Sequence, residues 1–422
     1  MDKKAVALLG LIVAAPVTAA TLPSGPELVV KSGGHHYQRT PAAAIAADGR
    51  AVVVWADANL GLRSRSISAG GALATEAALV ANLDHPPVPG AARVTDRKDP
   101  VVVYDAAGSS FYVFWTNEIA DVRVDFFHED RQIVDQDVFG QRFDGTGAPL
   151  GVAFRVNTDS TGFQSRPQVS RLTCGTGAPK ACKAGRFVVA WQSDNSAGVF
   201  ARTLDTSGTL GASQVHLSPA GPARDVALAA DDRGNVLALW DAPDSSQSGV
   251  FARTFNASLS PLAGAVQLNQ RVVGSQDRPT AAFNATTRQF LAAWQGKAQP
   301  DRYRTYGRLL GASGSPLGNQ FPITVGNSQW EVYPVVSTTL DGGFTAQWLA
   351  YDDHLPNAVR AVGLDGAGAR VGSEFNVNQN RPNAQARLAL VVGRTGDQLS
   401  TYEGFDASRS SSINLRWLKR SQ

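Results

Sequence analysis

The 422-residue sequence predicts an all-β fold built from seven repeats. A short apolar run ending in an aromatic residue recurs along the chain, at Trp55, Trp115, Trp191, Trp240, Trp294 and Trp348, with a weaker copy at Tyr402. The last four landmarks stand 54 residues apart, as positions 240, 294, 348 and 402 show. A fixed period near 50 residues is typical of solenoids, propellers and arrays. Forty-one Gly and 22 Pro add the many turns that such a chain needs.

Each repeat contains four expected strands, which the third repeat shows at residues 167–171, 186–193, 198–204 and 214–218. The second strand is apolar on both faces, so it should be covered on both sides. In a propeller the neighbouring blades supply that cover. The sequence therefore predicts a seven-bladed β-propeller of four-stranded blades.

The two ends of the chain predict how the ring closes. The seventh repeat stops after its third strand, at residues 412–420. An unassigned strand, ELVVKS at 27–32, precedes the first repeat. We expect it to complete the last blade, because a closed ring leaves no unprotected sheet edge there.

Turns and insertions complete the pattern. Turns such as FDGTG and LDTSG link third to fourth strands, and their Asp residues lack the ligand density of a calcium loop. Residues 117–135 lengthen the loop between second and third strands of the second repeat. Residues 172–185 lengthen the loop between first and second strands of the third repeat. These two insertions should lie on opposite faces.

The N-terminus predicts export. Lys3 and Lys4 precede an apolar run at 5–17, and small residues at 18–20 offer a cleavage site. We therefore expect a signal peptide at 1–20, one propeller domain at 21–422, and a secreted or periplasmic protein. No other segment is apolar and long enough to insert in a membrane.

The two cysteines, Cys174 and Cys182, lie eight residues apart around a Gly- and Pro-containing turn. In an exported protein a local disulfide is the favoured interpretation, clipping one hairpin. The net charge of +3 is small for this length and argues against a nucleic-acid partner.

The entries to the first strands predict a ring of side chains near the axis. The residue before the proline, or its equivalent, is Thr40, Asp99, Arg166, Arg224, Arg278, Tyr333 and Arg387. Four arginines at the mouth of a narrow channel would bind carboxylate or sulfate groups by paired hydrogen bonds. Alternatively, each arginine braces the ring by binding groups of the next blade.

Loops beside that ring hold the less repetitive residues. His35, His36 and Tyr37 precede the first repeat, and His85 precedes the second. VDFFHEDR with His128 and YDDH with His354 add further polar side chains. Histidine and tyrosine can move protons. No carboxylate stands at a metal-binding spacing from the histidine pair, so we predict no metal and no cofactor. Trp330 could stack on a sugar ring or cap the core.

The repeat unit, FVVAWQS followed by GVFARTLD and GTLG, resembles tandem repeats of large secreted bacterial proteins. The resemblance covers nearly the whole mature chain and implies a propeller-type fold and export. The architecture is also similar to that of seven-bladed polysaccharide lyases, ulvan lyases among them. That analogy implies an Arg such as Arg166 or Arg278 neutralising a carboxylate, with His35, His36 or Tyr333 moving protons.

The predicted function is that of a secreted propeller which binds an anionic or carbohydrate polymer on its top face. Arg166, Arg224, Arg278, Arg387, Trp330 and Tyr37 are the expected ligand contacts. One alternative is a lyase that cleaves a uronate-containing polysaccharide by β-elimination. Another is a cell-surface scaffold that binds a protein. The sequence holds no G-x-S-x-G, H-E-x-x-H, P-loop or dinucleotide-binding motif.

Overall fold

The described part of this computed structural model consists of β-strands and turns, with no helix. No described segment is therefore a helix long and apolar enough to cross a membrane. The predicted signal peptide lies outside the described residues. The structure describes residues 21–31, 38–81, 83–88, 91–105, 109–124, 129–175, 178–179, 182, 184–194, 198–219, 221–299, 302–326, 328–352, 355–379, 386–405 and 411–420.

Five of the sheets have the size of a single blade. The first contains β1 (Thr21–Lys31), β29 (Ser411–Arg420), β28 (Gln398–Phe405) and β27 (Ala386–Val392). The second contains β2 (Gln38–Ile45), β3 (Ala51–Asp57), β4 (Gly61–Ile67) and β5 (Ala77–Val80). The third contains β10 (Phe154–Arg155), β9 (Glu129–Asp144), β8 (Ser110–Val124), β7 (Ala91–Tyr104) and β6 (Leu83–Val88).

The remaining strands form two further blade-sized sheets and one wide sheet. The fourth sheet contains β11 (Gln164–Arg171), β12 (Phe187–Ser193), β13 (Gly198–Leu204) and β14 (Val215–His216). The fifth contains β15 (Arg224–Ala230), β16 (Val236–Ala242), β17 (Gly249–Phe255) and β18 (Val266–Gln267). The wide sheet contains β19 (Gln276–Asn284), β20 (Gln289–Gln299), β21 (Arg302–Gly311), β22 (Phe321–Pro322), β23 (Trp330–Thr338), β24 (Phe344–Asp352), β25 (Leu355–Leu364) and β26 (Arg370–Asn376).

The prediction of seven separate blades is wrong, because the described strands pair into five blade-sized sheets and one continuous eight-stranded sheet. In the wide sheet β21 and β23 pair in parallel at Tyr303 and Trp330. The Tyr303 N–H also donates to the carbonyl of Gln329 at 3.1 Å. The long hairpin of β20 and β21 thus reaches the start of β23, and the backbones hydrogen-bond where the repeat pattern predicts a break.

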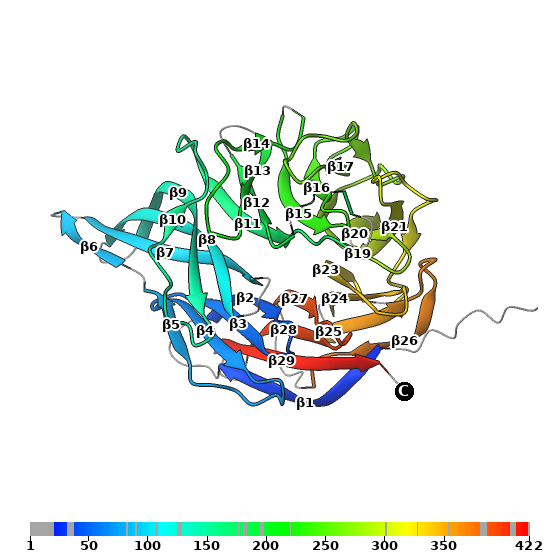
Figure 1. Cartoon of the computed structure of the whole chain (residues 1–422), viewed down its shortest axis with the longest axis horizontal. Coiled ribbons are helices and arrows are strands. Elements are labelled where there is room, and N and C mark those ends of the chain that lie inside the picture. Colours follow the sequence, from blue (N-terminus) through cyan, green and yellow to red (C-terminus); the bar gives the residue numbers. More distant parts are fainter. Residues whose placement is uncertain are drawn as a thin grey trace, which may run out of the picture.

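The sheets are arranged as a β-propeller around a central space (Figure 1). The innermost strands are β2, β7, β11, β15, β19, β23 and β27; each contacts the next, and β27 contacts β2. Apolar clusters fill the spaces between neighbouring sheets, such as that between the β11 and β15 sheets around Val188, Ala190 and Trp240. The six landmark tryptophans are 0–1% exposed and Tyr402 is 0% exposed. The prediction that they belong to the core is confirmed.

The N-terminal strand pairs with the C-terminal strand, as the sequence predicts. β1 runs antiparallel to β29, with Thr21 opposite Arg420 and Lys31 opposite Ile413 (Figure 1). The backbone N–H of Glu27 donates to the Gln379 side chain at 2.7 Å, and the N–H of Gln379 donates to the Glu27 carboxylate at 2.5 Å. Segments more than 350 residues apart therefore hold the ring closed.

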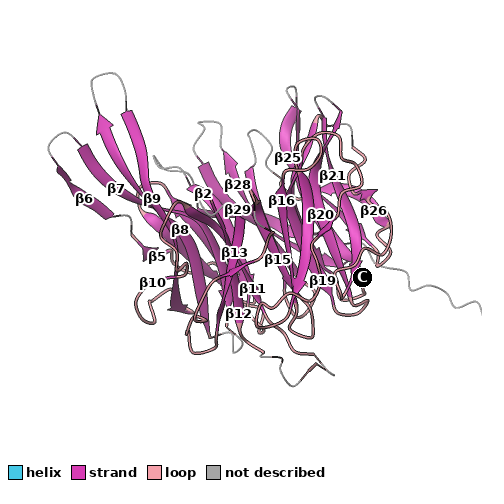
Figure 2. Cartoon of the chain, turned by 90° about the horizontal axis from the view of Figure 1, so that it is seen from above, coloured by secondary structure: helices cyan, strands magenta, loops and turns pink. Residues whose placement is uncertain are grey.

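The insertion of the second repeat is strand rather than loop. Residues 117–124 extend β8 and residues 129–135 extend β9, and the two segments pair with one another. Figure 2 shows β7, β8 and β9 projecting together with β6 at one end of the molecule. The prediction of a long loop at this place is wrong for the described residues.

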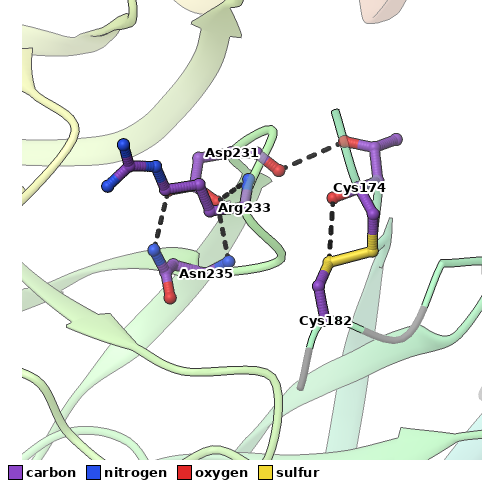
Figure 3. The surroundings of a disulfide bond; sticks show 6 residues. Cys174, Cys182, Asp231, Arg233 and Asn235 are labelled. Carbon is purple, nitrogen blue, oxygen red and sulfur yellow. Dashed lines mark hydrogen bonds between the residues drawn. A yellow bond between two sulfur atoms is a disulfide. The ribbon is translucent and has the colours of Figure 1, made fainter. Parts of the chain in front are cut away.

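The predicted disulfide between Cys174 and Cys182 is confirmed, with Cα atoms 6.0 Å apart. Its loop also contacts the neighbouring sheet, at the turn between β15 and β16 (Figure 3). The Thr173 hydroxyl donates to the carbonyl of Asp231 at 3.1 Å, and Cys174 pairs with Arg233 in an isolated bridge. The disulfide therefore clips the loop of the β11–β12 hairpin, as predicted, and the clipped loop also contacts the next sheet through hydrogen bonds.

Candidate functional site

Every innermost strand carries the same kink. One non-glycine residue in each has a positive φ, and a shift in strand register lies beside it, which is the geometry of a β-bulge. The residues, with φ in degrees, are Thr40 (49), Asp99 (50), Arg166 (53), Asp225 (48), Arg278 (52), Tyr333 (55) and Arg387 (48). We call these residues the axial ring. Residues other than glycine rarely adopt this backbone conformation, and such backbone strain is concentrated at functional sites.

Side chains of the preceding repeat hold several of these kinks in place. The backbone N–H of Arg166 donates to the Thr116 hydroxyl at 2.9 Å. The N–H of Asp225 donates to the Gln192 side-chain oxygen at 3.2 Å, and the N–H of Tyr333 donates to that of Gln295 at 3.0 Å. Each acceptor directly follows a landmark tryptophan. The buried core thus positions the axial ring, because the same strand that packs its Trp also presents the acceptor.

The axial ring opens into a cavity of ≈ 450 Å³ on the propeller axis. The residues that follow each ring member along its strand are mostly Pro, Ala, Val and Leu, and they line the rest of the cavity. A polar rim above apolar walls is the usual character of a ligand pocket.

The composition of the axial ring differs from the prediction in one repeat. Asp225, rather than Arg224, has the positive φ and lines the cavity, while Arg224 is exposed outside it. Val226 takes the place of the proline that follows the ring member in five other repeats, so the sequence pattern is displaced by one residue. The ring holds three arginines and two aspartates, a formal charge of 3 − 2 = +1, instead of four arginines.

Two of the three ring arginines are engaged by ring carboxylates. Arg166 forms an ion pair with Asp225, and an Arg387 nitrogen lies 3.9 Å from an Asp99 oxygen. Burial alone would lower the pKa of Arg166, but Asp225 and Asp99 outweigh it and the pKa is raised. For these two arginines the geometry matches the bracing alternative.

Arg278 is held differently. Its guanidinium carbon lies 4.5 Å from the centre of the Tyr333 ring, a cation–π contact. Among the described residues no carboxylate lies within 4.0 Å of its guanidinium. Burial raises the pKa values of Asp241 and Asp277, and Arg278 opposes that rise only in part. Arg278 is thus the ring arginine whose hydrogen-bonding edge is not occupied by an ion-pair partner.

Two buried carboxyl groups lie behind the ring, each directly after a landmark aromatic residue. Burial raises the pKa of Asp241 to about 7, with Asp225 and Asp277 adding to the effect. Burial also raises the pKa of Glu403 to about 7, against the opposing influence of Arg387 and Arg39. Both groups are 6% exposed or less. Their protonation near neutral pH changes the charge behind the ring.

Asp241→Asn should stabilise the protein increasingly as the pH rises from about 4 to 7. A carboxyl with a raised pKa keeps its proton in the folded state while the unfolded state loses it, so stability falls over this range in the parent. The variant lacks that loss, and the difference should grow by up to about 1.4 kcal/mol per pH unit. Urea unfolding at several pH values measures it. A difference independent of pH would contradict the buried, protonated state.

Half-buried aromatic side chains share a core cluster with Tyr333, the ring that Arg278 contacts. Trp330 and Tyr351 have ring centres 5.1 Å apart at 37°. Tyr303 pairs with Trp330 across the join of the wide sheet, and both pack with Tyr333 against one core cluster. Trp330 and Tyr333 were predicted as site residues from the sequence, whereas Tyr303 and Tyr351 were not.

The described structure does not place the other predicted site residues at the axial ring. His35, His36, Tyr37, His128 and His354 lie outside the described residues. His85 lies on β6, for which only the backbone is described. Asp241 and Glu403 were missed, although the polar residue that follows each landmark aromatic is a repeated signal in the sequence.

No family model and no curated protein matches the chain. A solved structure of a protein of unknown function from Dyadobacter fermentans is similar, with a TM-score of 0.55, 9% identity, and coverage of 96% of this chain and 100% of that one. NanB sialidase from Streptococcus pneumoniae has a TM-score of 0.48, 8% identity, and coverage of 93% and 70%. The intramolecular trans-sialidase from Ruminococcus gnavus has a TM-score of 0.45, 10% identity, and coverage of 96% and 98%. At such identities likeness concerns the fold and identifies no activity.

Proposed function

We propose that this protein binds an acidic polysaccharide at the axial ring, with Arg278 and Tyr333 as the central contacts. The observation that carries the proposal is the state of Arg278: it stacks on an aromatic ring at the rim of the cavity and has no carboxylate partner within 4.0 Å among the described residues. A guanidinium in that state can take a ligand carboxylate or sulfate by two parallel hydrogen bonds.

The surroundings support a sugar rather than a small inorganic anion. Tyr333 offers a half-buried ring face in contact with the cation, and Tyr351 and Trp330 flank the same core cluster as Tyr333. Binding sites for organic ligands combine such apolar faces with a few polar groups that set orientation. Arg166 and Arg387 line the same cavity but are paired with Asp225 and Asp99, so the formal charge of +1 of the ring corresponds to Arg278.

Arg278→Gln should weaken binding of polygalacturonate roughly tenfold to a hundredfold, because a charge-assisted contact is lost. Its melting temperature should fall by about 2 °C or less, since no ion pair is broken and only the cation–π contact with Tyr333 is lost. Isothermal titration calorimetry and thermal melting on the same sample measure both quantities. Affinity of the parent should also fall as salt is added.

Arg166→Gln is the matched control, because it removes a guanidinium group from the same ring. It leaves Asp225 without its ion-pair partner, so it should cost up to about 1 kcal/mol of stability for this partly exposed pair. Lower stability in Arg278→Gln without a selective loss of affinity would assign Arg278 to bracing and contradict the proposal.

A uronate lyase is the second candidate, favoured by the direct contact of Tyr333 with Arg278. In β-elimination a base removes the proton beside the carboxylate and an acid protonates the departing sugar oxygen, and a tyrosine hydroxyl can serve in such steps. The products absorb in the ultraviolet because they are unsaturated. Product formation that is lost in Tyr333→Phe while binding persists would favour the lyase.

A further inference from the structure

A series of aromatic residues connects Tyr333, the ring that Arg278 contacts, with the join of the wide sheet. Arg278 contacts the Tyr333 ring, and Tyr333 and Tyr351 pack against the same core cluster. Tyr351 contacts Trp330, which in turn pairs with Tyr303 at the join of the wide sheet. We call Tyr303, Trp330 and Tyr351 the aromatic track.

The repeat does not require aromatic residues at these places. Trp330 stands three residues before the ring member Tyr333, and the same position in the preceding repeat is Ser275. Tyr351 stands three residues after the landmark Trp348, and its counterpart after Trp294 is Lys297. A neighbouring repeat thus folds without an aromatic side chain at either position.

The residues of the aromatic track are more exposed than the aromatic residues of the core. The landmark tryptophans are 0–1% exposed, whereas all three track residues are half-buried and only flank a core cluster. Large rings left partly open to solvent beside a cation suit a ligand with flat apolar faces and polar edges. A pyranose ring has that character.

We propose that the aromatic track binds the sugar unit next to the one whose acidic group Arg278 holds, so that the ligand is an acidic oligosaccharide of at least two units. This inference rests on the proposed function of Arg278. It adds that recognition depends on chain length, with the acidic unit at the axial ring and its neighbour stacked on Trp330 and Tyr351.

Uronate monosaccharides and oligomers of two to four units test the inference, with galacturonate, mannuronate and glucuronate series as probes. The parent should bind the dimer roughly tenfold or more tightly than the monomer. Trp330→Ala should abolish that increase while keeping the affinity for the monomer within about twofold. Tyr351→Leu serves as a second variant that retains an apolar side chain should Trp330→Ala lose stability.

Trp417→Ala is the matched control, since Trp417 is also half-buried but flanks a different core cluster, on β29. It should leave the whole affinity series unchanged. The inference is overturned if Trp330→Ala and Tyr351→Leu keep the gain from monomer to dimer, or if either lowers the affinities for monomer and dimer equally. Failure of the parent to bind any member would overturn the proposed function as well, which separates the two failures.

Discussion

A protein that lacks residues 21–31 should melt about 5 °C or more below the parent, and it should associate at micromolar concentration. β1 covers the outer edge of β29 along nearly its whole length. Removing it exposes unpaired N–H and C=O groups, which recruit strands of other molecules. It also uncovers the apolar cluster that contains Val30 and Leu415. Differential scanning calorimetry and light scattering measure the two effects.

Two neighbouring valines of β1 give a sharper version of the same experiment. Val30 is 0% exposed and packs in the core, whereas Val29 is 45% exposed. Val30→Ala should lower stability, because it deletes buried methyl groups, and Val29→Ala should leave it nearly unchanged. Equal effects of the two substitutions, or a truncated protein as stable as the parent, would mean that β1 does not close the ring.

Trp191→Ala should lower the free energy of unfolding by about 3–5 kcal/mol. The side chain is 0% exposed and packs with Val189 and Phe200. Its indole N–H donates to the Gln164 side chain at 2.9 Å, so the substitution also leaves a buried acceptor without a donor. Urea unfolding followed by circular dichroism measures the loss.

Trp417→Ala provides the comparison for this prediction, since the same side chain is removed from a half-buried position. The loss there should be clearly smaller, because less apolar surface is withdrawn from water in the parent. A loss below about 1 kcal/mol in Trp191→Ala would contradict the placement of the landmark tryptophans between sheets.

The repeat pattern predicts much of this fold because each landmark combines two physical requirements. A second strand must be apolar on both faces, and its final Trp must fill the space between sheets; Trp191 and Trp240 do so. Pairing between β21 and β23 could not be predicted, since it depends on one backbone contact between Tyr303 and Trp330 rather than on side-chain pattern.

The position of the candidate site could be predicted from the sequence, but the charges of its residues could not. The proline that follows Arg166 and Arg278 marks the bulge, whereas the fourth repeat has Val226 there, so the ring member is Asp225 rather than Arg224. That displacement of one residue replaces a cation by an anion. The distinction between Arg166, which is paired, and Arg278, which stacks on Tyr333, depends on contacts between repeats that no single repeat encodes.

A crystal structure of the protein with a bound uronate trimer tests the central claim most directly. We expect a ligand carboxylate within about 3 Å of the Arg278 guanidinium, at the rim of the axial cavity. We also expect the adjacent sugar ring to stack on the Trp330 side chain. A trimer bound elsewhere, on the outer strands or along the extended β8–β9 hairpin, with Arg278 still contacting only Tyr333, would contradict it.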